Sequence, residues 1–342
     1  MYAGVDGGYI GSLSIWSSGI GSDSDLIGQD YSPASDWFFQ MVFVATTASI
    51  VSGALAERVL IWPFFAFVTI LTAILYPISG SWQWGGGWLS EMGFSDFAGS
   101  TIVHSVGGWA ALTGAILLGA RKGKFDSKGN ANVMPGQSIP MATLGVWILW
   151  LGWFGFNGAS QLALGSYADA NAVASIFANT TMAAAGGVIA PMVLSRLVDG
   201  KTNISATLNG AIAGLVSITA EPLTPTIGQA IIIGGIGGIL CMYGMKLLDK
   251  LKIDDVVGAI PAHLIAGIWG TIIVPFTNTD TSYGIQIIGI LAFGVFTVVT
   301  TSIVWTILKM SIGIRASEED EEYGLDVTET GTSGYPEYVS KK

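Results

Sequence analysis

The chain has 342 residues, of which 51% are hydrophobic and only 11% are charged. Soluble proteins carry roughly 25% charged residues, so this composition excludes a soluble globular domain and indicates an integral membrane protein. The net charge of −10 argues against nucleic acid as a partner, and the single cysteine, Cys241, excludes an internal disulfide framework. Part of this charge lies in one acidic run, residues 318–322, which we expect to be a solvated or regulatory end.

Residues 1–34 are rich in glycine, serine and aspartate, contain no lysine or arginine, and are predicted to form an extracytoplasmic loop. Nine apolar segments follow, and each is expected to be a helix because backbone groups in lipid must be hydrogen-bonded internally. Their approximate ranges are 35–56, 58–82, 98–120, 137–160, 170–195, 204–220, 226–247, 257–276 and 284–310. We therefore expect an all-α polytopic transmembrane domain over residues 35–310 and a cytoplasmic tail over residues 311–342.

The basic residues fall in alternate connections between these segments. All 14 lysines and arginines lie in or beside the first, third, fifth and seventh connections, or at and after the last segment. The positive-inside rule then places these connections and the C-terminus in the cytoplasm, and the N-terminus outside. The sequence thus predicts a multi-pass protein of the cell membrane.

The two histidines of the chain occupy matching positions in two of the segments. Aspartate, histidine and glycine recur with the same spacing, as Asp96, His104 and Gly108 and again as Asp255, His263 and Gly267. These segments are the third and the eighth, so the two copies run in opposite directions, as in an inverted-repeat transporter. The symmetry favours a pore lining, in which two imidazoles share a proton between ring nitrogens. A core histidine bonded to a backbone carbonyl is the alternative.

Asp96 is open to two interpretations. Aspartate is a favoured N-cap residue, so capping of its own helix is the first, and an influence on a bound cation is the second. Trp84 stands beside three glycines on the predicted outer side, where its ring could hold a cation by a cation–π attraction of about 0.5–2 kcal/mol. No metal-ligand cluster, cofactor loop or nucleophile–histidine–aspartate arrangement is apparent, so we do not expect a metal, a cofactor or an enzyme.

Five short motifs are distributed along the chain between about Phe39 and Tyr338. They are Gly53-Ala54-Leu55-Ala56-Glu57-Arg58, Trp84-Gly85-Gly86-Gly87, Asp96-Phe97-Ala98-Gly99, Trp153-Phe154-Gly155-Phe156-Asn157 and Gly324-Leu325-Asp326. Together they resemble the Amt branch of the ammonium transporter (Amt/Mep/Rh) family. This resemblance implies the ammonium-transporter fold, an inverted repeat of five helices plus one, and a homotrimer with one pore in each subunit.

The resemblance also implies roles for individual residues. The recruitment site would be Phe43, Trp84 and Ser160, the gate Phe43 and Phe156, the pore His104 and His263, and the support of the outer site Asp96. The implied mechanism is capture of ammonium outside, deprotonation near the gate, and conduction of ammonia through a hydrophobic twin-histidine pore. In prokaryotic members the tail works with a PII-type nitrogen-regulatory protein, which is therefore an implied partner.

Two departures from the family pattern are expected to matter. The first two helices of the family have no counterpart here, and Leu264 follows the second histidine where many members have glycine, which would narrow or reshape the pore. The alternatives are therefore an ammonium sensor, a Rh-like gas channel and a transport-dead fragment. Trp84 and the gate pair favour the Amt branch over the Rh-like channel, and the short tail holds no signalling domain.

Overall fold

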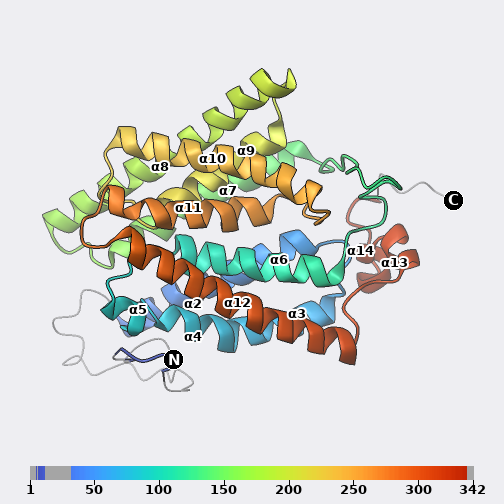
Figure 1. Cartoon of the computed structure of the whole chain (residues 1–342), viewed down its shortest axis with the longest axis horizontal. Coiled ribbons are helices and arrows are strands. Elements are labelled where there is room, and N and C mark those ends of the chain that lie inside the picture. Colours follow the sequence, from blue (N-terminus) through green and yellow to red (C-terminus); the bar gives the residue numbers. More distant parts are fainter. Residues whose placement is uncertain (1–4, 6, 12–31, 337–342) are drawn as a thin grey trace.

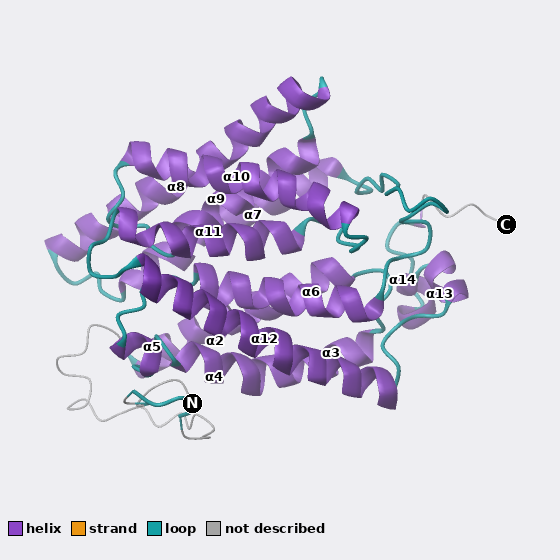
Figure 2. Cartoon of the chain, viewed as in Figure 1, coloured by secondary structure: helices purple, strands orange, loops and turns teal. Residues whose placement is uncertain are grey.

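The computed structural model describes residues 5, 7–11 and 32–336, which form helices joined by loops (Figure 2). Seven of these helices are long and apolar enough to cross a membrane. Two shorter apolar helices, Ile204–Thr219 and Pro261–Phe276, bring the segments to the nine that were predicted. Most of the predicted loop over residues 1–34 and the last residues of the tail, 337–342, lie outside the described residues. The predicted all-α polytopic architecture is confirmed.

The first part of the chain supplies most of the lower group of helices in Figure 1. Its elements are α2 (Pro33–Leu55), α3 (Ile61–Ile70), the π-helical stretch η1 (Leu71–Leu75), α4 (Tyr76–Ser81), α5 (Trp88–Glu91), the π-helical stretch η2 (Ser100–Ser105) and α6 (Val106–Leu118). Near the end of the chain, α12 (Tyr283–Ser311) returns to this group. Both α2 and α12 pack along α6, so η2 and α6 form the centre of the group.

The middle of the chain supplies the upper group in Figure 1. Its elements are α7 (Ile139–Gly158), the 3-10 turn η3 (Ala159–Gln161), α8 (Tyr167–Asp199), α9 (Ile204–Thr219), α10 (Ile227–Lys250), the π-helical stretch η4 (Pro261–Ile265), α11 (Ala266–Ile273) and the 3-10 turn η5 (Val274–Phe276). Helices α8, α9 and α10 pack on one another, and α11 packs on α9 and on η2. The contact between α11 and η2 joins the two groups.

Polar side chains in front of the apolar runs explain where several helices begin. The side chains of Ser166 and Thr226 each accept a hydrogen bond from the backbone amide three residues later. In return, the side chains of Asp169 and Gln229 accept a hydrogen bond from the backbone amides of Ser166 and Thr226. Such capping boxes satisfy amides that a helix start leaves without partners. The boundaries of α8 and α10 are therefore determined locally by sequence.

The tail packs against one end of the bundle, opposite to α5 (Figure 1). It contains the short helices α13 (Glu318–Tyr323) and α14 (Leu325–Thr330). The backbone of Ala316 donates to the carbonyl of Arg58 at 3.0 Å, and Leu60 donates to Ile314 at 3.0 Å. Within the acidic run, which is expected to be a solvated or regulatory end, the Glu321 side chain is only 5% exposed and pairs with Arg315.

Candidate functional site

Aromatic rings from three segments meet at the α5 end of the bundle. Phe43 on α2 packs edge-on against Trp84, with ring centroids 5.5 Å apart, and lies 4.2 Å from the ring of Phe156 on α7. Phe43 is buried among its neighbours, with only 1% of its surface exposed to solvent. Ser160 lies one helical turn beyond Phe156, and its hydroxyl donates to the Phe156 carbonyl at 2.8 Å. Ser160 lies in η3, directly after α7, and this bond ties its hydroxyl to the backbone at the end of α7.

The buried residue Asp96 holds both a helix start and the Trp84 indole. Its carboxylate accepts backbone hydrogen bonds of 2.8–3.0 Å from Gly99, Ser100, Thr101 and Ile102. Its carbonyl oxygen accepts a hydrogen bond from the Trp84 Nε1 at 2.9 Å. Burial raises the pKa of the Asp96 carboxyl, and the four amides oppose this increase. In the structure this side chain caps η2, while its backbone fixes the indole.

His104 and His263 face each other between the two groups of helices. Their Nδ1 atoms are 3.1 Å apart, and the rings are stacked with centroids 5.2 Å apart. One Nδ1 must donate and the other accept for this hydrogen bond to form. His104 also stacks on Trp153 at 5.0 Å and lies 5.2 Å from the ring of Phe156. Trp153, which opens one of the five motifs but was assigned no role from the sequence, is thus a direct neighbour of the pair.

Both histidines lie in π-helical stretches, His104 in η2 and His263 in η4. In η2, the amide of His104 donates to the carbonyl of Gly99 five residues earlier, at 3.0 Å. Single π-helical turns are rare and are found frequently at functional sites. The same unusual backbone at both histidines extends the sequence repeat to the level of local conformation.

Asp255 repeats the arrangement of Asp96 at the start of the second histidine segment. Its carboxylate accepts hydrogen bonds of 2.7–3.1 Å from the amides of Gly258, Ala259 and Ile260. Gly258, with φ +78°, stands three residues after Asp255, as Gly99, with φ +104°, stands after Asp96. Glycine adopts this left-handed conformation without steric cost. Each aspartate therefore starts its histidine helix by the same turn.

The glycines of the repeat, Gly108 and Gly267, lie where the two histidine helices cross. A Cβ on Gly108 would lie 2.6 Å from the Cβ of Leu264, and a Cβ on Gly267 would lie 2.5 Å from the Oγ of Ser105. Leu264 and Ser105 are the residues directly after the two histidines, so each glycine makes room for the opposite histidine segment. Leu264 is 5% exposed and belongs to the apolar core.

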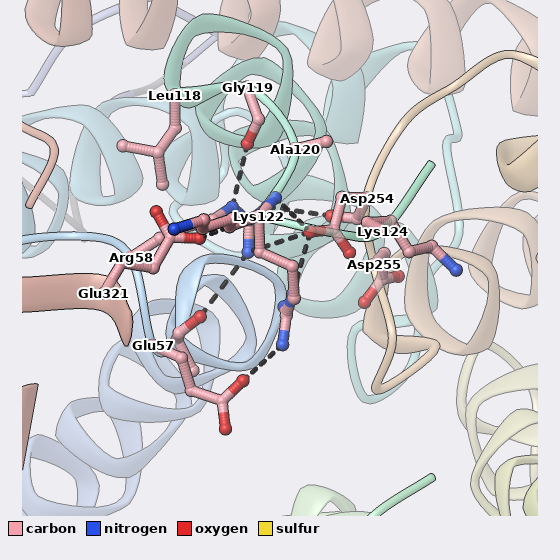
Figure 3. A network of polar contacts seen from close by, with 12 residues as sticks. Glu57, Arg58, Leu118, Gly119, Ala120, Lys122, Lys124, Asp254, Asp255 and Glu321 are labelled. Atoms are coloured by element: carbon pink, nitrogen blue, oxygen red, sulfur yellow. Dashed lines mark hydrogen bonds and ion pairs between the residues drawn. The ribbon is translucent and has the colours of Figure 1, made fainter. Parts of the chain in front are cut away.

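A cluster of buried charges lies at the opposite end of the bundle, between α2, α6 and the loop before η4 (Figure 3). Arg58 is wholly buried and donates to the carbonyls of Gly119 at 2.8 Å and Asp254 at 2.9 Å. The Asp254 carboxylate is also wholly buried and accepts from the Nε of Arg121 at 2.8 Å. Burial lowers the pKa of Arg58 to about 10, which leaves the guanidinium charged at neutral pH.

The tail adds further partners to this cluster. Arg315 donates to Glu321 at 2.8 Å, and the backbone of Lys122 donates to the same carboxylate at 2.6 Å. Arg121 forms an ion pair with Glu57 on the outer edge of the cluster. Figure 3 shows Glu57, Lys122, Asp254 and Glu321 close together, from the loops after α2 and α6, the loop before η4 and the tail. The cluster therefore ties four separate parts of the chain together.

Comparison with known proteins places this arrangement in a family. Residues 7–335 match the Ammonium Transporter Family. The chain belongs to the ammonium transporter family. It is 41% identical to the ammonium transporter Amt2 of Archaeoglobus fulgidus over 92% of this chain and 73% of that protein. An ammonium transporter of Bacillus subtilis is 34% identical over 93% of this chain and 80% of its own length.

Solved structures of ammonium transporters share the fold. A structure described as a "Sensor Amt Protein" aligns with a TM-score of 0.82 and 37% identity, covering 86% of this chain and 76% of that chain. The crystal structure of Candida albicans Mep2 aligns with a TM-score of 0.72 and 27% identity, covering 81% of this chain and 65% of that chain. The predicted family and fold are confirmed. Because the family consists of membrane transporters, the chain is a multi-pass membrane protein and not an enzyme.

Proposed function

We propose that the protein transports ammonium by capturing the cation at Trp84, deprotonating it near Phe43 and Phe156, and conducting ammonia past His104 and His263. One observation carries this proposal, a continuous series of ring contacts that joins these residues. The successive centroid distances from Trp84 to His263 are 5.5, 4.2, 5.2 and 5.2 Å. Every ring in the series was also predicted to be a site residue from the sequence.

The outer residues offer what an ammonium ion needs when it leaves water. The Trp84 ring supplies a π-face for the cation. The Ser160 hydroxyl donates a hydrogen bond to the Phe156 carbonyl, which leaves the lone pairs of its oxygen to accept an ammonium N–H. Asp96 supports this site indirectly, because its carboxylate is occupied by backbone amides and its carbonyl holds the indole.

The inner residues suit ammonia better than ammonium. Between Phe43 and Phe156 an ion would lose its water and gain only apolar neighbours, and the burial of an unpaired charge is costly. Neutral ammonia has three N–H donors and one lone pair. The hydrogen-bonded imidazoles can offer it both a donor and an acceptor. The ammonium ion must therefore lose its proton to water at the outer mouth before the gate, and the twin histidines receive the neutral molecule.

We infer from the positive-inside rule that the Trp84 end faces outside and the Arg58 cluster faces the cytoplasm. We also infer a homotrimer, as the resemblance to the family implies. Helix α7 carries apolar side chains that are open in the single chain, such as Trp147 (68% exposed) and Leu151 (70% exposed). Neighbouring subunits and lipid would cover them. A PII-type regulatory protein would approach the cytoplasmic end, where the tail is docked.

Ammonium sensing is a second candidate function. The structural likeness to a protein described as a "Sensor Amt Protein" favours it. In a sensor, ammonium would occupy the outer site, and the signal would leave through the docked tail and a partner protein. Sensing predicts ammonium binding without a matching flux, which separates it from transport.

Proteoliposomes containing the 342-residue chain test the proposal directly. Current and uptake of labelled methylammonium are measured for the wild-type chain, His104→Ala and His263→Ala. We expect specific uptake by the wild type and altered conduction or selectivity in both variants, with their helical content retained. Two variants that transport like the wild type would refute the pore assignment. Ammonium binding without uptake by folded, inserted wild type would favour the sensor.

A further inference from the structure

A short segment from the start of the chain lies on the turn that carries Trp84. This segment, Val5 and residues 7–9, is termed the strap. Three backbone hydrogen bonds join it to the turn: Val5 to the carbonyl of Gly85 at 3.3 Å, Gly7 to the carbonyl of Gly86 at 2.9 Å, and Trp88 to the carbonyl of Gly8 at 3.2 Å. The bonds run in both directions, so the strap and the turn are paired as two backbone segments.

A fourth bond connects the strap to the helix bundle. The Trp82 indole donates its Nε1 hydrogen to the carbonyl of Tyr9 at 2.8 Å. The same indole packs against Phe293 and Phe296 of α12, with centroids 5.4 and 5.0 Å away. Trp82 therefore serves as a fixed anchor, because its ring is held by a long helix of the core.

The glycines at this contact are required by the close approach of the two segments. A Cβ on Gly87 would lie 2.9 Å from the carbonyl oxygen of Gly8 and 2.6 Å from that of Ser81. Gly7 has φ +73°, a conformation that L side chains rarely adopt, and its missing side chain would meet the Glu91 carboxylate. A larger residue at Gly7 would strain the strap through its positive φ, and one at Gly87 would press on the turn itself as well as on Gly8.

We propose that the strap positions Trp84 for ammonium capture. Its bonds fall on residues at both sides of Trp84, namely Trp82, Gly85, Gly86 and Trp88. They hold the turn so that the indole stays against Phe43 and bonded to Asp96. A site held in place before binding avoids the entropic cost of ordering it on binding. This inference rests on the proposed recruitment role of Trp84. It gives the strap a supporting role in ammonium capture and none in conduction.

Two strap variants and one control test this assignment in the full-length chain. Gly7→Ala strains the strap, and Trp82→Phe removes the indole donor while keeping an aromatic ring. Ile10→Ala is the control, because this side chain is 64% exposed next to the strap. We expect the half-saturating methylammonium concentration to rise about three- to tenfold in the first two variants, as for the loss of one hydrogen bond. Maximal uptake should be unchanged, and Ile10→Ala should match the wild type.

Hydrogen exchange of residues 82–91 provides a second readout. It should become faster in Gly7→Ala and Trp82→Phe, and should not change in Ile10→Ala. Faster exchange with an unchanged half-saturating concentration would overturn the positioning role, as would a loss of maximal uptake alone. Trp84→Leu is measured in parallel. If it weakens capture while the strap variants do not, the inference fails and the proposed function stands. If Trp84→Leu has no effect, the recruitment site itself is wrong, and the role of the strap with it.

Discussion

Asp254→Asn tests whether the buried charge cluster stabilises the protein as one unit. The Asp254 carboxylate is 2.8 Å from the Nε of Arg121 and 3.8 Å from the Nη1 of Arg58. Asparagine preserves the shape but removes the carboxylate charge that pairs with Arg58 and, beside Glu57, with Arg121. Neither arginine can turn to water, since Arg58 is wholly buried and the Arg121 side chain is 8% exposed. Breaking a buried pair in this way costs about 3–5 kcal/mol, and we expect a loss of stability in this range.

Thermal unfolding in detergent, followed by the loss of circular dichroism, measures this effect. Asp199→Asn is the control, because Asp199 pairs with Lys246 at 3.1 Å and both side chains are exposed, by 39% and 45%. An exposed pair of this kind contributes at most about 1 kcal/mol. Asp254→Asn should therefore unfold at a clearly lower temperature than Asp199→Asn. Equal midpoints for the two variants would refute the argument that burial makes the Asp254 charge indispensable.

Three further changes test the outer site, the crossing and the helix cap. Trp84→Leu should raise the half-saturating methylammonium concentration and weaken selection against sodium and potassium in uptake competition; unchanged values would count against cation capture at the indole. Gly108→Ala should push Leu264 away and separate the imidazoles, so uptake should fall while circular dichroism stays helical; wild-type uptake would show that the crossing tolerates a methyl group. Asp96→Ala leaves four buried backbone amides without their acceptor. The free energy of unfolding, measured by thermal unfolding, should therefore fall by more than the about 1–3 kcal/mol expected for one unsatisfied buried group. A smaller decrease would mean that water replaces the carboxylate.

The fold could largely be predicted from sequence because lipid requires continuous helices. The predicted segment 204–220 corresponds to α9 (Ile204–Thr219), and 284–310 corresponds to α12 (Tyr283–Ser311). The largest differences occur where a helix continues beyond its apolar run. Helix α8 reaches Asp199, four residues past the predicted end, since helical hydrogen bonds form equally well where the polar residues emerge from lipid. Apolarity therefore predicts where the chain crosses the membrane better than where a helix ends.

The site could be predicted only as far as local patterns determine it. The identical spacing around His104 and His263 predicted a pair, because matching positions in an inverted repeat meet at the symmetry axis. The partners of Arg58 could not be predicted, because Asp254 is 196 positions away and only the packed helices bring them together. The strap was missed for the same reason, since it pairs with a turn about 80 residues later.

The crossing of the two histidine helices has a consequence for how the gene can change. Gly108 faces Leu264, and Gly267 faces Ser105, so each contact joins one half of the chain to the other. Backbone atoms of the opposite segment also lie within 3 Å of an added Cβ at both contacts: the Leu264 nitrogen and Cα at Gly108, and the Ser100 carbonyl oxygen at Gly267. A smaller side chain at position 264 or 105 therefore cannot make room for a larger residue at position 108 or 267. Both positions should remain glycine among related sequences, whatever residues stand at 264 and 105. Each half of the chain can then change only within limits that the other half sets, although the two are distant in the sequence.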